Sequence, residues 1–156
     1  MNIYESLSSP GFILNEQIAR QVFEIIPESG PLMLIIDRQG NVWPSNSDDF
    51  AELKIDESTL REICVKIDDG AEPVMTLIDD CSIVASQLAT DRSNCGYVIL
   101  ALPKYSPEST LANIDLIEML LNQLSLIARL IEKSNQLYEV HMKHHYAHAE
   151  SEIIAN

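Results

Sequence analysis

The hydrophobic positions in the first half of the chain follow two helical patterns. The first has Asn15 near its start and stops at Pro27. Its apolar residues recur at helical spacing: Leu14, Ile18, Val22 and Ile25. A second helix is predicted after Asp56, which can cap it, and its apolar residues share one face: Leu60, Ile63, Cys64 and Ile67.

Short apolar runs bounded by turn residues predict five strands, at 32–36, 41–43, 74–78, 82–88 and 96–102. The first two are joined by the turn 37–40, in which Gly40 can adopt a positive φ, and they form a hairpin. Residues 44–49 are predicted to be loop. The order of helix, two strands, helix, three strands and long helix predicts an α+β fold. We expect a mostly antiparallel sheet of about five strands flanked by helices.

The last helix is predicted to be very long. Ser106 can cap it, Pro107 suits its first position, and the helical pattern continues to about His148. Such a helix measures on the order of 60 Å, which exceeds the width of a small domain, so it must project or pair with another chain. We therefore expect a lead-in at 1–12, one domain at 13–133 and a helical extension at 134–156.

A heptad assigned with Ile117 at position a places apolar residues along one side of this helix. We predict that these residues form a dimer seam: Ile117, Leu120, Leu124, Ile127, Ile131 and Tyr138. Further apolar residues widen the arc: Leu116, Met119, Leu126, Leu130, Leu137 and Val140. All of these residues could cover the protein's own sheet. We favour an arrangement in which one side covers the sheet and the other meets a second chain in a homodimer.

All four histidines gather near the end of the same helix and share one face: His141, His144, His145 and His148. Imidazole pairs four residues apart on a helix can chelate one transition metal ion. A metal-responsive role is therefore one hypothesis for this face. The alternative is a polar helix end in which histidine is simply tolerated.

The chain is acidic, with a formal net charge of -14 from 24 acidic and 10 basic residues. This charge disfavours binding to nucleic acid and to anionic membranes, so we expect small molecules or proteins as partners. There is no apolar run of the roughly 18 residues needed to span a bilayer, and the N-terminus does not resemble a signal peptide, so a cytoplasmic location is expected. Three cysteines without a CxxC spacing, Cys64, Cys81 and Cys95, fit a reducing compartment.

The sequence resembles the GAF domain family in its order and pattern of elements. The similarity lies in the hairpin at 32–42, the segments 83–85 and 96–100, the helix start at 105–108 and the helix at 117–124. PAS and roadblock-type domains share a similar sheet with helices. The resemblance implies a sensory or regulatory domain with a small-molecule pocket on the open side of the sheet. The residues in that position are Trp43, Phe50, Cys64, Cys81 and Tyr97.

The ligand is left open, because the residues that bind cyclic nucleotides or attach bilins in members of that family are not found here. We expect the protein not to be an enzyme, since the sequence contains no GxSxG, HExxH, P-loop or GxGxxG motif. We expect a small molecule to change the seating of the long helix and thereby the dimer or its contact with a partner signalling protein. The alternatives are a ligand-free protein-interaction and dimerisation module, and a metal-responsive protein that uses the histidine face.

Overall fold

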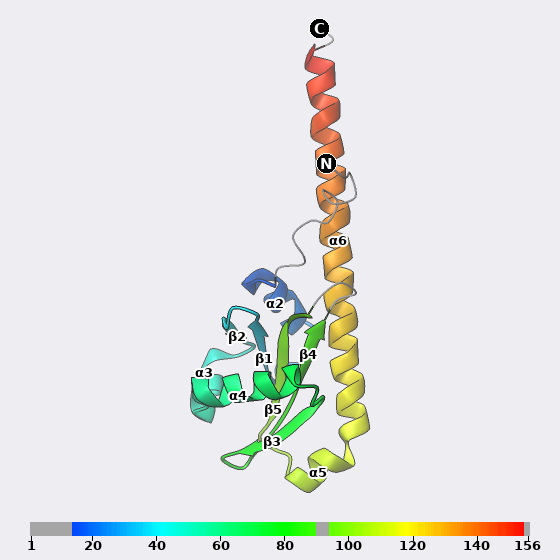
Figure 1. Ribbon diagram of the computed structural model, residues 1–156. Coiled ribbons are helices and arrows are strands. Elements are labelled where there is room, and N and C mark those ends of the chain that lie inside the picture. Colours follow the sequence, from blue (N-terminus) through cyan, green and yellow to red (C-terminus); the bar gives the residue numbers. More distant parts are fainter. Residues whose placement is uncertain (1–13, 90–93, 155–156) are drawn as a thin grey trace.

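The computed structural model describes residues 14–89 and 94–154, which form a sheet with helices on both of its faces (Figure 1). The sheet has five strands in the order β2-β1-β5-β4-β3, and all the neighbouring strands are antiparallel. The α+β class, the five-stranded antiparallel sheet and the long C-terminal helix agree with the sequence prediction.

The strands form where the apolar runs predicted them. Their bounds are β1 Leu32–Asp37, β2 Val42–Pro44, β3 Val74–Ile78, β4 Cys81–Ala89 and β5 Asn94–Leu102. The β1–β2 turn is held by the buried Asp37, whose carboxylate accepts hydrogen bonds from the backbone N–H groups of Gln39 and Asn41 and from the Asn41 side chain. Gly40 in this turn has the predicted positive φ, of 89°.

Two helices cover one face of the sheet. Helix α2 (Glu16–Phe23) begins at Asn15, which caps it by accepting a hydrogen bond from the Ile18 N–H, and it contacts the long helix α6 (Ile114–Ile154). Alternate strand residues point into this layer. The buried core there consists of Leu14, Ile18, Ala19, Val22, Met33, Ile35, Val84, Leu88, Cys95, Val98, Leu100, Leu102, Leu121, Leu124 and Ala128.

The opposite face is covered by α3 (Ser47–Leu53) and α4 (Glu57–Asp68). Asp56 caps α4 as predicted, by accepting a hydrogen bond from the Thr59 N–H. The prediction of loop at 44–49 was wrong from Ser47 onward. Asn46 caps α3 there by accepting hydrogen bonds from two backbone N–H groups, and this cap satisfies donors that a short helix otherwise leaves unpaired.

The predicted single C-terminal helix is divided near its start. A short helix α5 (Pro107–Ala112), capped by Ser106, ends at Asn113, and α6 begins at Ile114. From there α6 runs for 41 residues without interruption, so the predicted boundary at residue 133 falls inside one helix. Figure 1 shows α6 lying beside the sheet at its start and then continuing far past it.

Candidate functional site

Four of the five predicted pocket residues lie on the face covered by α3 and α4. Cys81 and Tyr97 belong to the buried cluster on that face, and Phe50 and Cys64 pack against it. Trp43 is different, because it packs against the cluster on the face covered by α2 and α6. Adjacent strand positions point to opposite faces of a sheet, and the register of β2 turns Trp43 away from the other four. The prediction that Trp43 lines the same pocket as the other four residues is therefore wrong.

Tyr97 is held by a polar cluster that the sequence did not predict. Its hydroxyl donates to the Asp68 carboxylate at the end of α4, at 2.7 Å from Oδ2, and accepts from Arg38 Nη1 at 2.7 Å. Arg38 also forms an ion pair with Asp68 at 3.2 Å. These three side chains connect the β1–β2 turn, α4 and β5. We call them the Tyr97 clamp.

Burial disfavours ionisation of Tyr97, Cys64 and Cys81. Burial raises the pKa of Tyr97 to about 12; its hydrogen bond to Asp68 adds to this rise and Arg38 opposes it. Burial, followed by the negative charge of Asp68, raises the pKa of the Cys64 thiol to about 11. Burial also raises the pKa of Cys81. Both thiols are thus held protonated near neutral pH, and the thiolate is the form that acts as a nucleophile.

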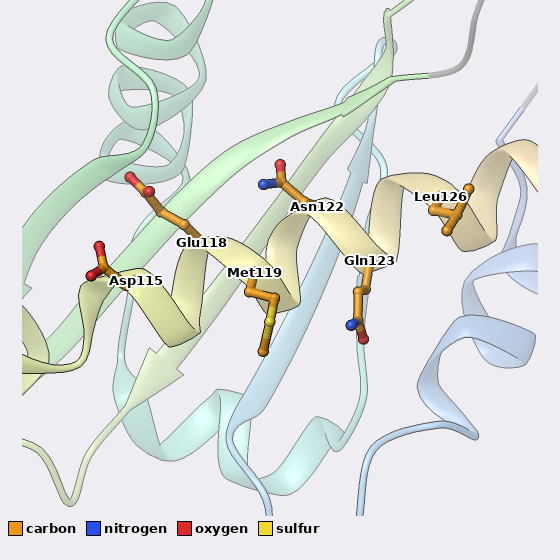
Figure 2. Close-up of a pocket in the computed structure, with 6 residues that line it drawn as sticks. All are labelled: Asp115, Glu118, Met119, Asn122, Gln123 and Leu126. Atoms are coloured by element: carbon orange, nitrogen blue, oxygen red, sulfur yellow. The ribbon is translucent and has the colours of Figure 1, made fainter.

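Two surface hollows lie on α6 rather than at the predicted pocket. The first, with a volume of about 370 Å³, is lined by Asp115, Glu118, Met119, Asn122, Gln123 and Leu126. Figure 2 shows that these six side chains all project from the same helix, so the hollow is a shallow groove along α6. The second, of about 410 Å³, lies between α2 and α6 and is lined by Gln21, Glu24, Ile127, Leu130, Ile131 and Ser134.

Most of the predicted dimer seam faces the protein's own core. Leu124 is buried, and Ile117, Leu120, Ile127 and Ile131 pack against the same cluster beneath α6. Tyr138, beyond the sheet, is exposed. The first four turns of this seam are occupied by the sheet and α2, which revises the predicted position of any contact with a second chain. Beside the sheet, these residues are therefore not available for contact with a second chain.

The other face of α6 carries a row of exposed large apolar side chains. Six of them are 52–71% exposed: Leu116, Met119, Leu126, Leu130, Leu137 and Val140. Single exposed apolar residues are common on protein surfaces, whereas exposed apolar residues that gather along one face are typical of a contact surface. This row was visible in the sequence, because its six residues are the ones that widen the apolar arc beyond the predicted dimer seam.

The histidine face lies on the projecting part of α6, where His141, His144, His145 and His148 are exposed. Among the residues that the structure describes, no group of three or more histidine, cysteine or acidic side chains is placed to hold a metal ion. Zinc sites in proteins use three or four protein ligands around one ion.

No helix in the described part of the chain is both long enough and apolar enough to cross a membrane. Comparison of the sequence with family models and with curated proteins, and of the structure with solved structures, gives no match. The resemblance to the GAF family therefore stays a prediction.

Proposed function

We propose that this protein is a non-catalytic protein-interaction module that assembles into a homodimer through α6. The observation that carries this proposal is the row of six exposed apolar side chains along the face of α6 turned away from the sheet. Apolar surface exposed to water is unfavourable, and covering it with a partner lowers the free energy.

The packing beneath α4 favours this interaction module over a ligand-gated sensor. Phe50, Cys64, Cys81 and Tyr97 pack against one buried cluster, and the polar groups of Tyr97 and Asp68 already bind each other. A ligand at this position would have to displace these contacts. The assembly proposal requires no such rearrangement, because the apolar row on α6 is already exposed.

Light scattering on the whole chain, from micromolar to millimolar concentration, tests the proposal. We expect a dimer whose population rises with concentration, since the row joins two identical surfaces. A chain that ends at Lys133 lacks Leu137 and Val140 and should dimerise more weakly. A monomeric mass over the whole range would refute the proposed function.

A further inference from the structure

The exposed residues of α6 follow the spacing of a coiled-coil seam. Starting at Leu116, the members are alternately three and four residues apart. They are Leu116, Met119, Gln123, Leu126, Leu130, Lys133, Leu137 and Val140. We call this row the outer seam. Its six apolar members are the residues that are 52–71% exposed, and its two polar members divide it into three apolar pairs.

The spacing identifies the kind of surface that can cover the outer seam. An average repeat of 3.5 residues keeps a row of side chains facing a second helix that supercoils around the first. A globular surface imposes no such repeat. The inner side of α6, by contrast, packs on the sheet and α2 through Leu121, Leu124 and Ala128. A partner helix on the outer seam would therefore leave this core packing in place.

The two polar members determine how a second copy can pair. In a parallel dimer in register, each residue meets its own copy, so Lys133 would face the Lys133 of the other chain inside the seam. Like charges in such a place are costly. In an antiparallel dimer with Leu116 opposite Val140, each apolar member meets an apolar member and the two polar members meet each other. The pairs are Leu116 with Val140, Met119 with Leu137, Gln123 with Lys133, and Leu126 with Leu130.

We propose that two copies of this chain associate through an antiparallel coiled coil of α6, with the outer seam paired in this register. In this arrangement Asp115 of each chain flanks the seam opposite Lys143 of the other, which gives two pairs of opposite charges. At the centre of the same flanking row the two copies of Arg129 lie opposite each other, outside the seam itself. In this register Met142 lies opposite Ile114, the first residue of the partner's α6. The partner helix therefore covers the exposed row beside the sheet and the projecting part of α6 as far as Met142.

This inference rests on the proposed function, since it specifies the geometry of the proposed dimer. Disulfide trapping tests it with two variants, Leu116→Cys and Val140→Cys, one of which carries an affinity tag. In the antiparallel dimer, position 116 lies beside position 140 of the other chain. The two copies of position 116 lie about 36 Å apart, far beyond the reach of a disulfide.

Mild oxidation of the mixed variants should give a disulfide between Leu116→Cys and Val140→Cys chains, and little disulfide between identical chains. The parent protein, with Cys64 partly buried and Cys81 and Cys95 buried, controls for the native thiols. Disulfides between identical chains would overturn the orientation and leave the proposed dimer standing. A dimer in which no pair links would place the interface elsewhere and also overturn the inference. A monomer would overturn both proposals.

A charge substitution at the centre of the seam provides the second test. The Leu126→Glu/Leu130→Glu double variant should raise the dissociation constant of the dimer by at least about 100-fold, because each carboxylate would be desolvated between leucines. Tyr138→Glu is the control, since Tyr138 is also exposed on α6, at 66% against 52% for Leu126 and 58% for Leu130, but lies outside the outer seam. It should leave the dimer unchanged. An unaltered dimer in the double variant, or dissociation by Tyr138→Glu, would overturn the assignment of the seam.

Discussion

Replacing Leu124 and Leu130 separately by alanine tests whether α6 has two faces with different roles. The two leucines lie on one helix, but Leu124 is 0% exposed in the core and Leu130 is 58% exposed on the outer seam. Truncation at Leu124 removes buried methyl groups and leaves a cavity, which costs about 3 to 5 kcal/mol of unfolding free energy. Truncation at Leu130 should cost the monomer less than about 1 kcal/mol, because most of that side chain is already in water.

Urea unfolding followed by far-ultraviolet circular dichroism measures both costs, at a concentration low enough for the chain to be monomeric. With a denaturant slope of about 2 kcal/mol per molar urea, Leu124→Ala should lower the midpoint by about 1.5 to 2.5 M and Leu130→Ala by less than about 0.5 M. The dimer dissociation constant should respond in the opposite order, with the larger effect at Leu130. Equal losses of stability in the two variants would refute the assignment of inner and outer faces.

Two further predictions concern the sheet and the clamp. Gly96→Ala should destabilise the fold by at least about 2 kcal/mol in thermal unfolding, because its Cβ would lie 2.1 Å from the Ile36 carbonyl oxygen. Gly40→Ala, with nothing within 4 Å of its Cβ, should cost less, about 1 to 2 kcal/mol for its positive φ; equal losses would contradict the close contact at Gly96. The pKa of Tyr97 is raised from 10.0 to about 12, so the folded state holds the phenol proton more tightly than the unfolded state does. This contribution is complete below pH 10 and is lost as the pH rises toward 12, and Tyr97→Phe should show a smaller loss of unfolding free energy over that range. Identical pH profiles for the two proteins would argue against the clamp.

Elements with strong periodic patterns were predictable from the sequence, because a buried face imposes its spacing on the residues that form it. The helix capped by Asn15, the five strands and the helix capped by Asp56 all appear close to their predicted bounds. Helix α3 was missed, since it buries no residue completely and thus has no apolar stripe to identify it. The break at Asn113 was missed for a related reason, because the apolar pattern continues across it.

The candidate sites were harder to predict, because they depend on contacts between residues far apart in the sequence. A buried tyrosine needs a partner for its hydroxyl, which makes a clamp around Tyr97 reasonable to expect. The sequence does not identify Arg38 and Asp68, which lie 59 and 29 positions away, as those partners. Trp43 shows the opposite problem. Its inclusion in the pocket relied on its position in the chain, directly before the segment that the family resemblance places at the pocket, while a shift of one residue in a strand reverses the face on which a side chain lies.

Past the end of the sheet, the two rows of α6 differ in composition. The predicted dimer seam faces the core as far as Ile131, the last of its residues that packs there, and then continues with Ser134, Tyr138 and His141. After Lys133 the outer seam resumes with two apolar residues, Leu137 and Val140. A helix that served only to cover the sheet would need no such residues beyond it. The continuation of the outer seam past the sheet supports a second contact surface on α6. In the proposed antiparallel pair, this part of the outer seam packs on the outer face of the partner's α6, at the level where the partner's helix lies beside the partner's sheet.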